Sequence, residues 1–257
     1  MIVQQSLLIL WDVLKTIFVS IGLIFTEIKR LFFYKRKDVR GKLALVTGGA
    51  NGLGRGICLR LAELGCRIAI ADINLKAAEK TCEEIRGKGY KAKAYKIDVT
   101  NADEITKLRD DVFNDLGTVD ILINNAGLMS NKNLEETSEN IEAMLKVNIL
   151  GVILNLRTEK WRKKIKTTCV CPYYIKTRED VIDFLNPKFP ALEMEDAANE
   201  TVEGILREDR VVTIPRHQMA LCKFLNIFPL SVQEAVRDRI LKEYEFNNPN
   251  CKLNFDF

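Results

Sequence analysis

Histidine is almost absent from this chain of 257 residues, because His217 is the only one. A single imidazole excludes metal sites built from several histidines and any mechanism that needs two of them. The seven cysteines have irregular spacing, which predicts neither a disulfide framework nor a zinc ribbon. Cys169 and Cys171 have C-x-C spacing, but they stand in an apolar run and are expected to pack in the core. We therefore expect a reduced, intracellular protein without a metal.

The chain also lacks a strong excess of charge of either sign. Its 39 Lys and Arg residues against 35 Asp and Glu residues give a formal net charge of +4. That balance is too modest to indicate a nucleic-acid partner. The composition, 47% hydrophobic and 29% charged, is typical of a globular protein, and the length is sufficient for a substantial core without disulfides.

The first forty residues form a separate compositional unit. Residues 7–25 are almost wholly apolar, with Asp12 and Lys15 as the only charged residues, and these two share one helix face. A basic cluster follows, which favours the cytosolic side of a membrane. Its members are Lys29, Arg30, Lys35, Arg36, Lys37 and Arg40.

We expect residues 1–38 to be a membrane anchor with a basic flank, either as one tilted helix or as a hairpin in one leaflet. A helix packed on the surface of the folded domain is the alternative. A secretory signal peptide is not expected, because no basic region precedes the apolar run and no small-residue cleavage site follows it.

Residues 39–257 alternate between short apolar segments and amphipathic segments. The predicted strands are 43–47, 67–71, 91–97 and 119–123, and the predicted helices are 55–64, 75–87 and 101–116. This alternation predicts an α/β fold with a doubly wound parallel sheet of the Rossmann type. An unbroken helical stripe then covers 141–156, and a strand at 167–171 follows, which we expect beside the strand at 119–123.

The turn after the first strand has a glycine pattern typical of dinucleotide binding. Gly48 permits a tight turn, Gly52 lets the backbone approach a pyrophosphate, and Gly54 lets the helix pack closely on the strand. The helix N-terminus adds free N–H groups for an anion. Asp72, at the end of the second strand, is expected to bind the adenosine ribose and to repel a 2′-phosphate, which favours NAD over NADP.

Several motifs follow one another in the order found in short-chain dehydrogenases/reductases, and the chain resembles this family over about 41–257. They are Thr47-Gly48-x-x-x-Gly52-x-Gly54, Asp98-Val99, Asn124-Asn125-Ala126-Gly127, Val147-Asn148-Ile149-Leu150-Gly151, and Lys166–Pro172 with Thr177. The resemblance implies that Asn148 supports the catalytic proton relay. It also implies an NAD site made of Gly48, Asn51, Gly52, Leu53, Gly54, Asp72, Asp98, Val99, Asn125, Ala126, Gly127 and Thr177.

The apolar N-terminus, Asp72-Ile73-Asn74 and Lys166–Pro172 resemble the membrane-associated branch that includes epidermal retinol dehydrogenase and the 17-beta-hydroxysteroid dehydrogenases of types 11 and 13. That branch implies NAD-linked oxidation of lipophilic alcohols at the endoplasmic reticulum or lipid droplets, with the domain facing the cytosol. The implied partners are a lipophilic alcohol or ketone, the membrane, and a second subunit in a homo- or heterodimer.

The chain lacks the residues that carry the family's reaction. This reaction uses a tyrosine, a lysine four residues later and a serine, but none of the six tyrosines has lysine at that spacing. No serine stands between Ser138 and Ser231, and only 24 residues separate Asn148 from Pro172. We interpret this as an internal deletion that leaves the sheet one central strand short.

Three functional hypotheses follow. In the first, the chain is an NAD-dependent membrane-bound dehydrogenase by descent, whose full-length form oxidises retinoid or steroid alcohols. In the second, it is a non-catalytic protein that binds NAD or a protein partner, and in the third it is a truncated chain that does not fold stably. Because the reacting groups are missing, impaired catalysis is the preferred hypothesis. Tyr173 and Tyr174 stand near the expected nicotinamide site, but we interpret them as structural or exposed loop residues, and His217 as a solvated or interfacial side chain.

Overall fold

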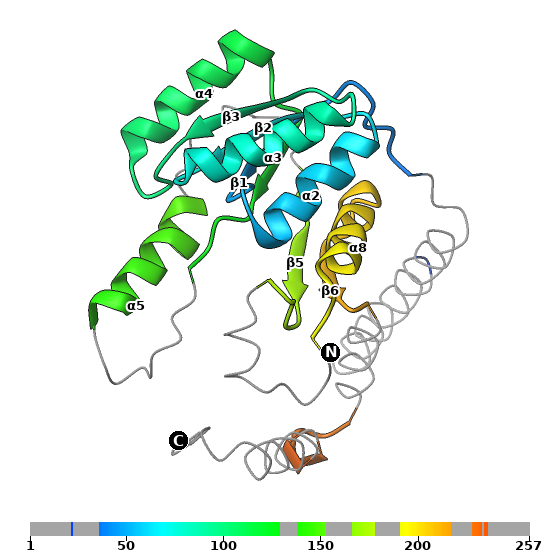
Figure 1. Cartoon of the computed structure of the whole chain (residues 1–257). Coiled ribbons are helices and arrows are strands. Elements are labelled where there is room, and N and C mark those ends of the chain that lie inside the picture. The colour runs from blue at the N-terminus through cyan, green and yellow to red at the C-terminus, as the bar shows by residue number, and fades with distance from the viewer. Residues whose placement is uncertain are drawn as a thin grey trace, which may run out of the picture. The chain divides into compact units, whose positions relative to one another are not determined.

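Figure 1 shows the computed structural model, which describes residues 22, 36–128, 138–152, 166–177, 191–216, 228–232 and 234–235. The chain divides into two units, Met1–Lys37 and Asp38–Phe257. The predicted anchor and His217 lie outside the described residues, apart from Gly22 and residues 36–38 of the anchor. Among the helices that the structure describes, none combines the length and the apolar character needed to cross a membrane.

The larger sheet has four parallel strands in the order β3-β2-β1-β4. Its strands are β1 (Leu43–Thr47), β2 (Arg67–Asp72), β3 (Ala92–Lys96) and β4 (Ile121–Asn124). The connecting helices are α2 (Gly52–Glu63), α3 (Leu75–Gly87) and α4 (Ala102–Leu116). The prediction of a Rossmann-type parallel sheet is confirmed, and the strand order reverses between β1 and β4, where such sheets bind ligands.

The core has one layer on each face of this sheet, because successive side chains of a strand point to opposite faces. Ala44 and Val46 of β1 pack on one face with residues of α2 and α3. Leu43 and Leu45 pack on the other face with Ile105 and other residues of α4. Figure 1 shows these helices covering the sheet.

Local sequence signals explain where the helices begin and end. The side chain of Asn74 accepts a hydrogen bond from Ala77 N at 3.1 Å, and Asn101 accepts from Asp103 N and Glu104 N. These N-caps satisfy amide groups that have no partner within the helix. Gly117, with φ of +89°, ends α4 in a backbone conformation that favours glycine.

A second, two-stranded parallel sheet pairs β5 (Cys169–Pro172) with β6 (Val211–Ile214). The helix α8 (Met194–Leu206) lies against β6 and packs on α2. The two helices approach closely at Gly56, where an added Cβ would lie 2.9 Å from the Cβ of Ala198. The contact between α2 and α8 therefore holds the smaller sheet beside the larger one.

The predicted pairing of the strand at 167–171 with the strand at 119–123 is wrong. Within the described part of the chain, β4 pairs only with β1, and β5 pairs with β6. Val170 is the only residue of β5 in an apolar cluster, and this cluster contains Val212 and Ile214 of β6. Partial burial of Val170 against β6 and α8 thus favours β6 as the partner of β5.

The prediction that Cys169 and Cys171 pack in the core is also wrong, because both side chains are exposed. With Val170 directed to the apolar cluster, the alternation of a strand turns its two neighbours to the opposite face. Of the helical stripe predicted at 141–156, residues 141–152 are helical, and residues 153–156 lie outside the described residues. The helix α5 (Ser138–Leu145) continues into the π-helix η1 (Lys146–Leu150), and Leu145 and Ile149 are exposed.

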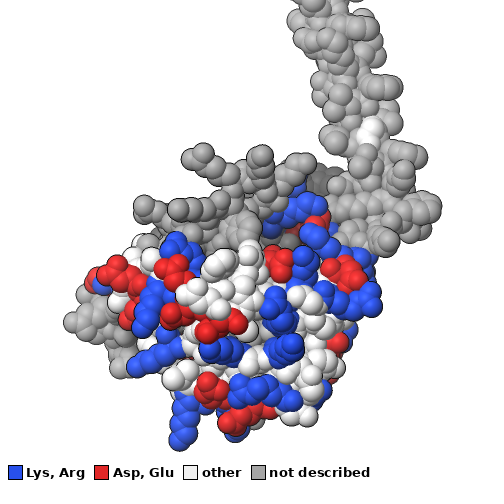
Figure 2. All heavy atoms as spheres, turned by 90° about the horizontal axis from the view of Figure 1, so that it is seen from above, with Lys and Arg blue, Asp and Glu red and all other residues white. Residues whose placement is uncertain are grey.

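Charged side chains of both signs are interspersed over the face of the molecule in Figure 2. Lys42 pairs with Asp120 at 2.9 Å, and Lys93 pairs with Asp115 at 2.6 Å. Such half-exposed ion pairs contribute little to stability. The face in this view therefore carries no extended patch of one sign, which agrees with the modest net charge.

Replacement of Gly56 by Leu tests the contact between α2 and α8. The larger side chain meets Ala198, so Gly56→Leu is expected to lower the free energy of unfolding by about 1–3 kcal/mol. The control is Gly87→Leu in α3, where an added Cβ meets nothing within 4 Å and leucine favours the helix. Urea denaturation followed by circular dichroism measures both, and equal midpoints for the two variants would contradict the close packing.

Candidate functional site

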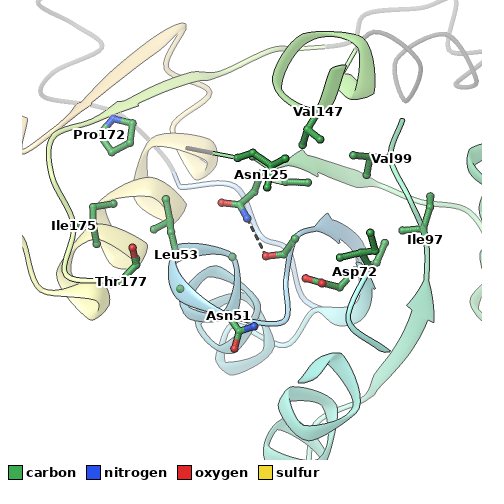
Figure 3. A pocket seen from close by; sticks show the side chains of 18 of the residues that line it. Asn51, Leu53, Asp72, Ile97, Val99, Asn125, Val147, Pro172, Ile175 and Thr177 are labelled. Carbon is green, nitrogen blue, oxygen red and sulfur yellow. Dashed lines mark hydrogen bonds between the residues drawn. The ribbon is translucent and has the colours of Figure 1, made fainter. Parts of the chain in front are cut away.

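A pocket of about 940 Å³ lies where the carboxyl ends of β1, β2 and β4 face the segment after β5 (Figure 3). Every residue predicted to bind the cofactor lines it. These residues are Gly48, Asn51, Gly52, Leu53, Gly54, Asp72, Asp98, Val99, Asn125, Ala126, Gly127 and Thr177. The structure therefore brings together, in one concave site, residues that the sequence spreads over 130 positions.

Two glycines of the first turn stand where no side chain fits. Gly48 has φ of +65°, and a Cβ on it would lie 2.8 Å from the Cα of Ala126. A Cβ on Gly54 would lie 2.2 Å from the carbonyl oxygen of Gly48. Real Cβ atoms do not approach backbone so closely, and the turn can take this shape only with glycine at both positions.

The N-terminus of α2 faces this pocket without a cap of its own. The side chain of Asn51, the residue before the helix, makes no capping hydrogen bond, and the first turn contains no acidic residue. The first N–H groups of a helix have no partner within the helix and carry partial positive charge. With the glycines beside it, this helix start is suited to bind an anionic group such as a phosphate.

A hydrogen-bond network joins the turn after β1 to the end of β4. The buried hydroxyl of Thr47 accepts from Asn125 N at 3.1 Å and from Ala126 N at 3.2 Å. The side-chain amide of Asn125 donates to Thr47 O at 3.2 Å and to Gly48 O at 3.1 Å. Sequence reasoning missed this role of Thr47; the signal was a hydroxyl in the last position of a fully buried strand.

Asp72 is held at the rim of the pocket by backbone donors. Its Oδ2 accepts from Ala50 N at 3.1 Å, and its Oδ1 accepts from Asn74 N at 2.9 Å. Each carboxylate oxygen has capacity for a further donor. Ile73 and Ile97, which sequence reasoning also missed, form an apolar part of the lining, and each stands directly beside a predicted site residue.

Asn148, predicted to support a proton relay, does not line the pocket but fixes one of its walls. Its Oδ1 accepts from Leu128 N at 2.8 Å, and its Nδ2 donates to Leu128 O at 3.0 Å. One side chain of η1 thus pairs with both backbone groups of a pocket residue. Asn148 holds the segment after β4 in position.

Tyr173 and Tyr174 are the only described tyrosines that line the pocket. Their rings meet edge to face, with centroids 4.8 Å apart. The nearest lysine after them, Lys176, forms an ion pair with Glu193 at 2.5 Å. Burial and a hydrogen bond to Asp115 raise the pKa of Tyr95, which lies outside the pocket lining.

Thr47→Val tests the network at the base of the pocket. Valine keeps the shape of threonine but leaves Asn125 N and Ala126 N without their acceptor, and we expect a loss of about 1–3 kcal/mol of unfolding free energy. Thr106→Val, on the exposed face of α4, removes a hydroxyl that donates to Ala102 O and should change stability by less than about 0.5 kcal/mol. Chemical denaturation of both variants measures the two losses of unfolding free energy. An equal loss in Thr47→Val and Thr106→Val would contradict the role of the Thr47 hydroxyl.

Comparison with known proteins gives relatives for most of the chain. The family model of the short chain dehydrogenases matches residues 42–158. Short-chain dehydrogenase/reductase family 16C member 6 of Bos taurus is 29% identical, over 71% of this chain and 75% of its own length. Human epidermal retinol dehydrogenase 2 is 27% identical over 79% and 83%, and human 17-beta-hydroxysteroid dehydrogenase 13 is 26% identical over 88% and 91%.

Solved structures share the fold. A short-chain type dehydrogenase/reductase from Mycobacterium marinum superposes with a TM-score of 0.61 and 21% identity, over 68% of this chain and 94% of its own. A structure from Haemophilus influenza with bound NAD gives a TM-score of 0.57 and 20% identity, over 69% and 95%. The relatives are those of the membrane-associated branch that the motifs indicate, and this chain is similar to the short-chain dehydrogenases over residues 42–158.

Proposed function

We propose that this chain binds NAD in the pocket and that its oxidation of alcohols is strongly impaired relative to its family. One observation carries the proposal: all twelve predicted cofactor residues line one pocket, whereas no tyrosine of the chain has a lysine four residues later. The machinery that holds the cofactor is thus separate from the groups that transfer the proton.

The fit of NAD rests on three features of the pocket. Gly48 and Gly54 leave backbone accessible where a side chain would block it, and the uncapped start of α2 suits a pyrophosphate. Asp72 offers a carboxylate to the hydroxyls of a ribose, and the apolar Ile73 and Ile97 beside it suit the flat ring attached to that ribose. When bound, NAD would supply the nicotinamide that accepts or donates a hydride.

Asp72 also favours NAD over NADP. Its carboxylate is fixed by Ala50 N and Asn74 N, so it cannot swing away without breaking two hydrogen bonds. A 2′-phosphate on the adenosine ribose would bring a second negative charge close to it, and like charges repel strongly at the edge of a protein.

Impaired catalysis is supported by the length of the alignments as well as by the missing residues. The alignment with human 17-beta-hydroxysteroid dehydrogenase 13 extends over 285 positions and takes in 88% of this chain, which is about 226 of its 257 residues. About 59 aligned positions, the excess of 285 over 226, thus have no counterpart in this chain. Together, these positions are as many as a strand and most of a helix contain.

The two tyrosines of the pocket do not replace the missing group. In the family's reaction a lysine one helical turn from the tyrosine lowers the pKa of its phenol, whereas Lys176 is in the loop after β5 and pairs with Glu193.

The substrate class and location proposed here follow from the relatives' names and the N-terminal sequence. Two relatives act, by name, on retinol and on 17-beta-hydroxysteroids, which favours a lipophilic alcohol or ketone as the ligand of the pocket. The apolar and basic residues 1–38 support attachment to the endoplasmic reticulum membrane or a lipid droplet, with the domain in the cytosol. A homo- or heterodimer is part of this proposal.

Titration of the full chain with NADH, followed by the fluorescence of the reduced nicotinamide, tests the cofactor. We expect saturable binding that Gly54→Ala weakens by about tenfold or more, because the added Cβ meets Gly48 O. Asp72→Asn is expected to bring the affinities for NADH and NADPH closer together. The controls are Gly87→Ala and Asp103→Asn, and a wild-type chain that binds NADPH as tightly as NADH would contradict the role of Asp72.

A turnover assay separates impaired catalysis from loss of folding. Microsomes that hold the full chain are expected to oxidise retinol and 17-beta-hydroxysteroids no faster than empty microsomes, although the chain binds NADH. Human epidermal retinol dehydrogenase 2 is the positive control. Loss of one general acid–base group alone costs about 10²–10⁴ in rate. Turnover within tenfold of the control enzyme would overturn the proposed impairment, and its loss in Tyr173→Phe or Tyr174→Phe would identify the substitute.

A further inference from the structure

Cys169 and Cys171 form a pair of exposed thiols on one face of β5. Their sulfur atoms are 3.9 Å apart, and Val170 between them packs into the apolar cluster with Val212 and Ile214. Neither cysteine lines the pocket. The pair is thus a second chemical feature of this chain, distinct from the proposed NAD site.

The other cysteines that the structure describes are not accessible to solvent in this way. Cys58, Cys66 and Cys82 are buried, and burial raises the pKa of Cys66 and of Cys82 to about 11. The pKa of the Cys171 thiol is also raised, by partial burial and by the neighbouring Cys169. The contrast with the β5 pair is one of access, because an ion from solvent cannot reach a buried thiol, whereas Cys169 and Cys171 are exposed. Among the cysteines that the structure describes, an ion from solvent therefore meets two thiols only at β5.

The strand backbone keeps the two thiols from closing easily into a disulfide. Two residues along a strand advance by about 6.6 Å, near the upper limit of about 6.8 Å for the Cα separation of a disulfide. Hydrogen bonds to β6, from Cys169 N to Arg210 O at 2.9 Å and from Tyr173 N to Ile214 O at 2.8 Å, hold both ends of β5 extended. An ion that bridges the sulfurs needs no such approach.

We propose that Cys169 and Cys171 together bind Cu(I). Thiolates are soft ligands that select this ion, and Cu(I) is satisfied by two of them in a linear arrangement. A structural zinc site takes four ligands. The separation of 3.9 Å is slightly short for a linear S–Cu–S unit, and small rotations of the two exposed side chains lengthen it. Binding of Cu(I) releases both thiol protons and changes no oxidation state.

An anaerobic titration of the full chain with Cu(I) tests this site, with bicinchoninate as the competitor whose colour reports the copper that the protein has not taken. The wild-type chain is expected to retain one equivalent of Cu(I) more than the double variant Cys169→Ser/Cys171→Ser. Each single variant should lose the same equivalent, because one thiolate does not complete the site. Thermal melts of these exposed substitutions check that the fold is unchanged.

A matched control keeps two thiols in β5 but separates them. In Val170→Cys/Cys171→Ser the remaining thiols point to opposite faces of the strand, and we expect no extra equivalent of Cu(I). If this variant does not fold, the two single variants carry the comparison. Equal Cu(I) retention by the wild type and the double variant overturns the proposal. A matching difference with Zn²⁺ in place of Cu(I) also overturns it, because the site would then lack the predicted selectivity.

Discussion

The close approach between the turn after β1 and the segment after β4 is the contact on which the site depends. Gly54 leaves no room for a Cβ against Gly48 O, and the amide of Asn125 donates to two carbonyl oxygens of the turn. The hydroxyl of Thr47 satisfies two further backbone amides from the opposite side. A shift of the turn against the end of β4 would leave a donor or acceptor of this network without its partner. These hydrogen bonds therefore hold the turn and the end of β4 in one arrangement at the floor of the pocket.

The packing of α2 against α8 positions the part of the pocket lining that follows β5. β5 and β6 share no hydrogen bond with the larger sheet in the described part of the chain, so their position comes from helix packing rather than from sheet continuity. Gly56 and Ala198 are small enough for the two helix backbones to approach, and Val202 and Leu206 of α8 join the core cluster of α2. As a consequence, Thr177, which follows β5, lies against Gly52 at the start of α2, although β5 is not a strand of the larger sheet.

The parts of the fold that local chemistry dictates are readable from the sequence. The predicted bounds of β1 and α3 agree with the structure, because an apolar strand and an Asn cap are local signals, and the glycine spacing locates the pocket for the same reason. The partner of β5 is not readable in this way, since it depends on burial of Val170 among residues that come forty positions later. Cysteine is frequently buried, so composition alone places Cys169 in the core, and only the direction of the strand shows otherwise.

The proposed separation of cofactor binding from catalysis agrees with the order of these elements along the chain. Residues 43–128 supply the turn, the uncapped helix, the rim carboxylate and the network of Thr47, and all of them are complete within the four-stranded sheet. β1 pairs with β2 and with β4, and the hydrogen bonds at the base of the pocket join the turn after β1 to the end of β4. The proposed loss of the proton relay therefore leaves the hydrogen bonds of Thr47 and Asn125 in place, because all their partners lie within residues 47–126.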